Sequence, residues 1–418
     1  MGSSEGGALH PSRPRWAADP SPKTPLRSPP PETHRCQIAP PTGIRPRQCN
    51  STNDAATTGR GDDPVPRAVK PLRIWLVGFG TVGRWVVRAL EAQAERLAGR
   101  YGVAVKLVGL ANARDGFFYY ENGLDLPSVS AVASGGGSIA GQLGARRWPS
   151  AIEGLRATDA DLLVEVTASP SSDGEPGLAH MREALGRGVP VVTSNKWPVA
   201  LYGVELAALA RGQGVAFCAE STVMSGTPVL RALVDGLAGA TPIALRGLLN
   251  ATANFILSRM AQGTPYEDAL AEAQRAGLAE RDPAADVEGH DTAAKVMILS
   301  ALVFGRQLRV EQVARRGITD IARSELDKAA SGGERLKHVA TLEFSGPDGA
   351  GHVSARVQPE FVSRDDPLAH VDGTTNAVVC HARPVGEVTI IGPGAGPELA
   401  GQGVLSDLIA VARSRTGD

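Results

Sequence analysis

Short apolar runs alternate with helix-like segments between residues 72 and 218. The apolar runs cover residues 74–77, 103–110, 162–166, 189–192 and 215–218. The helix-like segments cover residues 82–100, 178–187 and 204–211. Such alternation is typical of a parallel sheet whose strands are joined by crossover helices. The pattern therefore predicts an α/β fold for this part of the chain.

A glycine-rich turn lies between the first apolar run and the first helix-like segment. It has the spacing GxGxxG and consists of Gly78, Phe79, Gly80, Thr81, Val82 and Gly83. The first glycine of such a turn permits the bend, the second lets a pyrophosphate approach the backbone, and the third lets strand and helix pack closely. Glycine turns also occur for packing alone, but the strand before and the helix after favour a Rossmann-type dinucleotide-binding domain.

The end of the second apolar run bears on the choice of cofactor. An enzyme strict for NAD usually has a carboxylate there that binds the ribose 2′-hydroxyl. Residues 111–115 read Ala-Asn-Ala-Arg-Asp, and Arg114 suits a 2′-phosphate, although an ordinary solvated arginine explains it equally well. Both NADP and NAD remain open as cofactors.

Residues 280–295 concentrate acidic side chains in front of one lysine and an apolar run. Pro283 and Gly289 indicate a turn, Asp291 lies where a helix begins, and Lys295 follows four residues later on the same face. A lysine entering an apolar helix is costly unless carboxylates compensate its charge, and lysines with a shifted pKa serve in proton transfer. The segment predicts a proton-transfer site, with a solvated ion pair at a helix start as the alternative.

The composition is that of a globular protein with room for two domains. The 418 residues are 42% hydrophobic and 21% charged, and the formal net charge of -1 gives no basic footprint for nucleic acid. The four cysteines have neither metal-ligand nor disulfide-framework spacing. No stretch has the roughly 18 to 20 apolar residues that cross a bilayer, and the N-terminus lacks a secretory signal. We therefore expect a cytoplasmic protein with no nucleic-acid or membrane partner.

The sequence divides into an extension and two domains. Residues 1–70 hold 13 of the 30 prolines and few aliphatic clusters, so they are expected to be disordered. A Rossmann domain is expected at 71–220, completed by 392–418. A catalytic and dimerisation domain of the α+β class is expected at 221–391. Its helical pattern extends through Lys295, and strand-like runs follow at residues 340–343, 352–357, 377–380 and 387–391.

Three further stretches complete a set of five motifs. The first joins residues 174–177 to 191–196 and ends in Asn195-Lys196; the second joins 217–228 to 247–257; the third joins 371–377 to 392–396. With the glycine turn and the acidic segment, they resemble the homoserine dehydrogenase family over almost all of residues 72–418. Five ordered motifs at family-like spacing are far more specific than any single one.

The resemblance implies the reversible NAD(P)-dependent interconversion of L-homoserine and L-aspartate 4-semialdehyde, on the route to threonine and methionine. It implies that Lys295 exchanges a proton with the substrate oxygen, that Glu280 and Asp291 hold the substrate, and that Lys196 lies at the substrate and the nicotinamide. Asp286 is a further candidate for the substrate amino group, or a helix cap. The carboxyl ends of parallel strands bind ligands, which favours a functional Lys196 over a solvated one.

The resemblance also implies contacts to cofactor and cation. Thr167, Lys196, Gly277 and Gly394 are expected at the cofactor together with the glycine turn. A monovalent cation, Na⁺, is expected at a carboxylate and backbone carbonyls of Glu220, Val223, Ser225 and Thr227. A tight turn with a capped carboxylate is the alternative there. A homodimer through the sheet of the second domain is also implied.

Two other functions are compatible with parts of this pattern. One is another NAD(P)-dependent dehydrogenase of a small amino acid or semialdehyde. The other is a catalytically inactive nucleotide-binding module, but the presence of both Lys196 and Lys295 argues against it.

Overall fold

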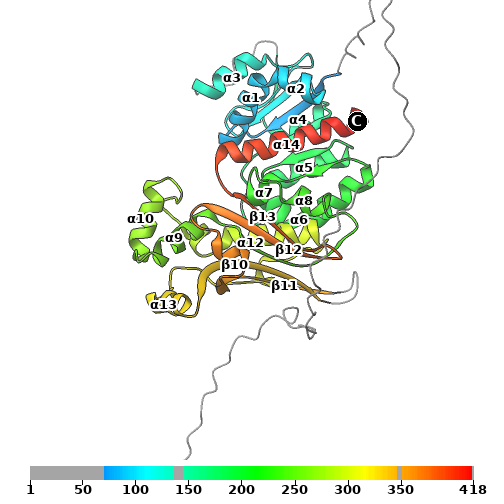
Figure 1. The fold of residues 1–418 in the computed structure, drawn as a ribbon. Coiled ribbons are helices and arrows are strands. Elements are labelled where there is room, and N and C mark those ends of the chain that lie inside the picture. The colour runs from blue at the N-terminus through cyan, green and yellow to red at the C-terminus, as the bar shows by residue number, and fades with distance from the viewer. Residues whose placement is uncertain (1–69, 136–144, 346–350, 417–418) are drawn as a thin grey trace, which may run out of the picture. The chain divides into compact units, whose positions relative to one another are not determined.

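The first seven strands form one sheet, here called the first sheet (Figure 1). The computed structural model describes residues 70–135, 145–345 and 351–416, so nearly all of the expected extension at 1–70 lies outside the described residues. In chain order the strands are β1 (Leu72–Val77), β2 (Val105–Asn112), β3 (Gly116–Tyr119), β4 (Arg146–Trp148), β5 (Leu162–Glu165), β6 (Val191–Thr193) and β7 (Phe217–Cys218). Their order across the sheet is β4-β3-β2-β1-β5-β6-β7.

The first sheet is parallel except at one edge. Strands β2, β1, β5, β6 and β7 are parallel, whereas β3 is antiparallel to both β2 and β4. The chain reverses after β2 because Asn112 accepts a hydrogen bond from the Asp115 amide at 2.5 Å and Gly116 adopts a φ of 82°. The predicted parallel sheet is confirmed for these five strands, and the antiparallel hairpin of β3 and β4 at its edge was not predicted.

Helices cover both faces of the first sheet. They are α1 (Thr81–Ala92), α2 (Ala94–Tyr101), α3 (Leu126–Gly135), α4 (Ala151–Ala157), α5 (Gly177–Gly186), α6 (Lys196–Gln213) and α14 (Pro397–Thr416). Alternate residues of β1 serve the two faces: Ile74 and Leu76 join a core with α1 and α14, and Trp75 and Val77 join a core with α5 and α6. The last helix of the chain thus lies beside α1, the first one described (Figure 1).

The single helix predicted for residues 82–100 is two helices. Helix α1 ends at Ala92 and α2 starts at Ala94, with Gln93 between them at a φ of -110° and ψ of 12°. Good helix formers occupy residues 89–98 on both sides of the break, so propensity alone does not mark it. The prediction was correct in type and wrong in continuity.

The second sheet has six strands in the order β13-β12-β8-β10-β11-β9. They are β8 (Thr241–Leu248), β9 (Val313–Arg315), β10 (Glu334–Ser345), β11 (His352–Ser363), β12 (Thr375–Arg383) and β13 (Gly386–Pro393). All neighbours are antiparallel except β9 and β11. The four strand-like runs predicted beyond residue 340 are confirmed as β10 to β13.

Strands β8 and β9 were missed in the sequence. Residues 241–248 read Thr-Pro-Ile-Ala-Leu-Arg-Gly-Leu, in which alanine, leucine and arginine favour a helix. Pairing with both β10 and β12 overrides that local preference. The predicted fold class, a Rossmann-type domain with a second α+β part, is confirmed.

Helix α12 (His290–Val303) connects the second sheet to α6. Ten consecutive residues from Thr292 to Ala301 are buried, because the helix packs on the sheet and on α6 at once. Gly203 of α6 permits the close approach, since a Cβ there would lie 2.9 Å from the Ala301 Cβ. The packing brings the first residues of α6 and α12 to one place.

The remaining helices are short or lie at the periphery of the second sheet. They are α7 (Ser221–Met224), α8 (Leu230–Val234), α9 (Ala251–Ala261), α10 (Tyr266–Arg275), α11 (Ala284–Val287) and α13 (Arg323–Ser331), with 3-10 turns η3 (Val310–Gln312) and η4 (Pro367–His370). Among all helices described, none is both long and apolar enough to span a bilayer.

We expect Gly83→Ala to destabilise the protein. A Cβ at Gly83 would overlap the Gly78 carbonyl oxygen, whereas one at Gly80 would have no atom within 4 Å. Overpacking of this kind costs about 1 to 3 kcal/mol of unfolding free energy, more than the roughly 1 kcal/mol that alanine gains inside a helix. Urea denaturation measures the difference, with Gly80→Ala as the matched control. Equal unfolding free energies for the two variants would contradict the close packing.

Candidate active site

The glycine turn has the geometry of a dinucleotide site. Gly78 has a φ of 109°, and a Cβ there would lie 2.6 Å from the Val166 carbonyl carbon and 2.8 Å from the Thr167 nitrogen. Gly80 is the N-cap of α1, no side chain caps the helix there, and a Cβ on Gly80 would have no atom within 4 Å. A diphosphate fits such a helix end because the amides and the helix dipole both favour negative charge. Thr167 lies beside this turn, and its contact with the cofactor stays a prediction.

Arg114 lies in the turn after β2 with an exposed side chain. Its neighbours Asn112 and Asp115 bind each other, since Asn112 Nδ2 donates to Asp115 Oδ2 at 3.0 Å. Among the described residues no hydrogen bond or ion pair engages the Arg114 guanidinium. The side chain is therefore available to a ligand at the end of β2.

The two lysines predicted at the site meet on one carboxylate. Lys196 Nζ, at the start of α6, forms an ion pair with Asp291 Oδ1. Lys295 Nζ lies 2.9 Å from Asp291 Oδ2 and donates to the Leu249 carbonyl oxygen at 2.6 Å. The Lys295 side chain is 9% exposed and the Lys196 side chain 38%. One lysine is thus enclosed and the other is partly open to a ligand.

The protonation of the two lysines is biased in opposite directions. Burial lowers the pKa of Lys295 below the ordinary 10.5, although Asp291 acts against it. Burial also acts on Lys196, but there the charge of Asp291 prevails and the pKa lies above 10.5. Burial would raise the pKa of Asp291, yet the two ammonium groups hold it below its usual value. The site combines a lysine that loses its proton more readily with one that stays charged.

Asn250 joins the acidic residues of the site. Its Nδ2 donates to Asp286 Oδ1 at 2.7 Å and to Asp291 Oδ2 at 3.2 Å, and its Oδ1 caps α9 by accepting from the Ala253 amide at 2.8 Å. Burial raises the pKa of Asp286, while Asn250 acts to lower it. The sequence placed Asn250 within a motif but gave it no role. Its position as N-cap before a helical run was the available signal.

Glu280 and Gly277 lie away from these contacts. Both are exposed in the turn between α10 and α11, where the Glu280 carbonyl accepts from Gln274 Nε2 at 3.1 Å. Gly277 has a φ of 71°, which explains the glycine without a ligand. Within the described part of the chain, no contact joins the Glu280 carboxylate to either lysine. Their roles stay predictions.

The loop predicted to bind a cation is held by internal hydrogen bonds. The Glu220 carboxylate caps α8 by accepting from the Val229, Leu230 and Arg231 amides at 2.6 to 2.8 Å. A carboxylate has about four lone-pair directions, so most of its capacity is used. Val223 is buried in the short helix α7. No group of three His, Cys, Asp or Glu residues able to hold a metal occurs in the described ranges.

The same loop contacts the segment after β13. Ser225 Oγ donates to the Gly394 carbonyl oxygen at 3.1 Å, and Thr227 Oγ1 donates to that of Pro393 at 2.9 Å. A Cβ on Gly394 would overlap the buried Asn376 amide. Packing therefore accounts for Gly394, and a cofactor contact there stays a prediction.

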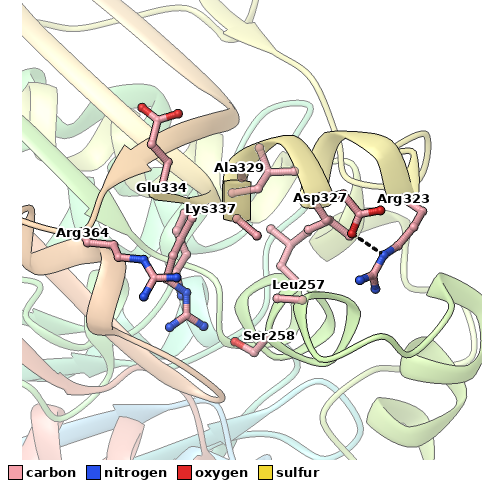
Figure 2. Close-up of a pocket in the computed structure, with 13 residues that line it drawn as sticks. Leu257, Ser258, Arg323, Asp327, Ala329, Glu334, Lys337 and Arg364 are labelled. Carbon is pink, nitrogen blue, oxygen red and sulfur yellow. Dashed lines mark hydrogen bonds and ion pairs between the residues drawn. The ribbon is translucent and has the colours of Figure 1, made fainter. Parts of the chain in front are cut away.

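A cavity of about 290 Å³ lies between α9, α13 and β10 rather than at the lysines (Figure 2). One of its lining residues, Lys337, is 2% exposed and donates to the Val371 carbonyl at 2.6 Å and to Asp372 Oδ1 at 2.7 Å. Figure 2 shows Arg323 paired with Asp327 on another wall. Burial alone thus does not identify a reactive lysine, and neither Lys196 nor Lys295 lines this cavity.

Two family models match the chain. The model for the NAD-binding domain of homoserine dehydrogenase covers residues 78–220, and the model for homoserine dehydrogenase covers residues 228–409. The NAD(+)-dependent homoserine dehydrogenase of Pseudomonas canavaninivorans is 37% identical over 345 residues, which is 82% of this chain and 97% of the relative. The homoserine dehydrogenase of Methanocaldococcus jannaschii is 35% identical over 82% of this chain and 98% of the relative.

Solved structures agree with the sequence comparison. A homoserine dehydrogenase from Thiobacillus denitrificans has a TM-score of 0.69 and 32% identity over 84% of this chain and 75% of its own. A hyperthermophilic archaeal homoserine dehydrogenase mutant, solved with NADPH, has a TM-score of 0.68 and 30% identity over 82% of this chain and 98% of its own. Matches of this extent across both sheets show that the chain belongs to the homoserine dehydrogenase family, the NAD(P)-dependent oxidoreductases that interconvert L-homoserine and L-aspartate 4-semialdehyde in amino-acid biosynthesis.

Proposed function

We propose that Lys295 is the proton donor and acceptor of this homoserine dehydrogenase and that Lys196 is its fixed positive charge. The observation that supports this division is the single carboxylate of Asp291, which binds both ammonium groups while only Lys196 is substantially exposed. Two lysines that share one carboxylate suit a substrate alcohol that must lose a proton as it becomes a carbonyl.

The proton moves between the substrate oxygen and Lys295 Nζ. When the cofactor is bound, the nicotinamide accepts or supplies the hydride. In the oxidation direction neutral Lys295 takes the hydroxyl proton, and in the reduction direction its ammonium returns a proton to the oxygen. The Leu249 carbonyl and Asp291 orient Nζ, and burial lowers its pKa so that the neutral form is more accessible.

The carboxylates serve the amino group of the substrate. Asp286 and Asp291 are linked through Asn250, so their oxygens are fixed relative to Lys295. Glu280 joins them as a further substrate ligand in this proposal. The raised pKa of Lys196 keeps its ammonium group charged. In this proposal that positive charge stabilises a substrate oxygen that is negative or becomes negative during the reaction.

The glycine turn, Thr167, Lys196, Gly277 and Gly394 hold the cofactor in this proposal. The relative from Pseudomonas canavaninivorans is named for NAD(+), whereas the archaeal structure contains NADPH. We propose that this chain accepts both, with the exposed Arg114 favouring the 2′-phosphate of NADP. Na⁺ would bind backbone carbonyls of Val223, Ser225 and Thr227 beside Glu220, whose carboxylate is largely used as a cap.

We further propose a cytoplasmic homodimer built through the second sheet. Its outer strand β13 exposes apolar side chains, Ile391 being 54% exposed, and an apolar edge strand suits pairing with another chain. Cys218 and Cys380, the cysteines within the described ranges, are both free thiols, as suits a reducing compartment.

Lys295→Met should lower turnover by on the order of 10²-fold or more, because it removes the proton carrier while keeping an unbranched side chain of similar length. The measurement is kcat for homoserine oxidation, followed by absorbance of the reduced cofactor, with circular dichroism to establish folding. Lys328→Met, at an exposed lysine of α13, is the matched control and should retain normal turnover. A folded Lys295→Met enzyme with near-normal kcat would remove Lys295 from the proton transfer.

The two reaction directions should respond oppositely to pH. Oxidation needs neutral Lys295, so its kcat/KM should rise with pH to a plateau, with an inflection below 10.5, and reduction should fall over the same range. Asp291 raises the pKa of Lys295, so Asp291→Asn should move the inflection to lower pH. An inflection that moved to higher pH in Asp291→Asn would contradict the assignment.

Arg114→Ala should weaken NADP more than NAD. A charge-assisted hydrogen bond to the 2′-phosphate would be lost, which corresponds to on the order of 10-fold in kcat/KM with NADP. The ratio of kcat/KM for the two cofactors is the measurement, because a general loss of folding or activity leaves the ratio unchanged. Equal effects on both cofactors would show that Arg114 does not contact the phosphate.

A further inference from the structure

One carboxylate with no solvent exposure lies outside the contacts of the candidate active site described above. Glu165 ends β5 and is 0% exposed. Three side chains surround it: Asn195 Nδ2 donates to Oε2 at 3.1 Å, Thr167 Oγ1 donates to Oε1, and His180 Nδ1 lies 3.4 Å from Oε1. Burying a carboxylate is costly unless polar partners replace water, and here they come from the loop after β5, from α5 and from the start of α6.

Asn195 links this carboxylate to Lys196. It is 3% exposed, it is the N-cap residue of α6, and Lys196 is the first residue of that helix. The Asn195 amide also contacts Thr167 Oγ1 at 3.1 Å and Ser169 Oγ at 2.8 Å. Gly177 at the start of α5 leaves room for this amide, since a Cβ there would overlap Nδ2. The backbone from which Lys196 projects is thus fixed by a buried side-chain network.

The two oxygens of Glu165 set the direction of the hydrogen bonds in this network. Asn195 presents its NH₂ group to Oε2, which accepts from it. A glutamine at the same position would offer a donor as well as an acceptor, and the amide of Asn195 would no longer be held in one orientation. The arrangement therefore depends on the carboxylate and not only on the space it fills.

We propose that Glu165 is a positioning residue for the reaction, acting through Asn195 on Lys196. The inference rests on the role of Lys196 proposed above. Glu165 touches neither lysine, and its effect on the reaction is to hold the start of α6 so that Lys196 Nζ reaches Asp291. His180 of α5 also contacts Glu165.

A double-mutant cycle tests the proposal. Glu165→Gln should lower kcat/KM for homoserine by on the order of 10-fold or more, since small displacements of a substrate-positioning group have effects of that size or larger. In a Lys196→Met background the same change should alter kcat/KM by less than about 2-fold, because residues that act through one another are non-additive. Urea denaturation of each variant establishes that it folds.

The matched control is Glu205→Gln. Glu205 lies on α6 and pairs with Arg182 of α5 at 2.7 Å, so the change loosens the same helix pair without touching Asn195. It should leave kcat/KM unchanged. If Glu165→Gln does not fold, Asn195→Ser replaces it in the double-mutant cycle. This change removes the hydrogen bond between Asn195 and Glu165 but keeps a residue suited to a helix start.

The outcomes separate this inference from the proposed role of Lys196. If Glu165→Gln, or Asn195→Ser in its place, lowers kcat/KM by the same factor with and without Lys196, Glu165 acts independently and the inference is overturned. If Lys196→Met alone has normal kcat/KM, the role of Lys196 fails first and the inference fails with it. A loss with Lys196 present that disappears in its absence supports it.

Discussion

The site depends on one carboxylate shared by two ammonium groups. Asp291 belongs to the first turn of α12, Lys295 lies one turn later, and Lys196 begins α6 almost a hundred residues earlier in the chain. The ion pair between Lys196 and Asp291 forms only because α6 and α12 pack side by side, which the absence of a side chain at Gly203 permits. The packing of α6 against α12 thus determines the distance between Lys196 Nζ and the Asp291 carboxylate.

Two groups of buried polar side chains fix the residues of the site. In one, Asn250 binds Asp286 and Asp291 while capping α9. In the other, Glu165 binds Asn195 at the start of α6. Each group uses a side chain that is itself part of a helix terminus, so the site residues and the beginnings of the helices are stabilised together.

Local patterns in the sequence predicted the parts of the site that depend on local geometry. The glycine turn needs only strand, bend and helix in succession, and Asp291 and Lys295 need only helical spacing. The family resemblance implied that Lys196 and Asp291 both lie at the substrate; the structure pairs the two side chains, and their roles stay predictions. Asn250, Glu165 and His180 received no role, because their importance comes from partners 15 to 41 residues away in sequence. Strand β8 was missed for the same reason, since pairing on both sides overrides its helix-forming residues.

The return of α14 to the first sheet has a consequence for biosynthesis of the protein. Val404, Leu405 and Leu408 complete a core that otherwise comes from residues before 193. Until α14 has been synthesised, that apolar surface has no cover, so the nucleotide-binding domain cannot complete its core before the second sheet has been translated.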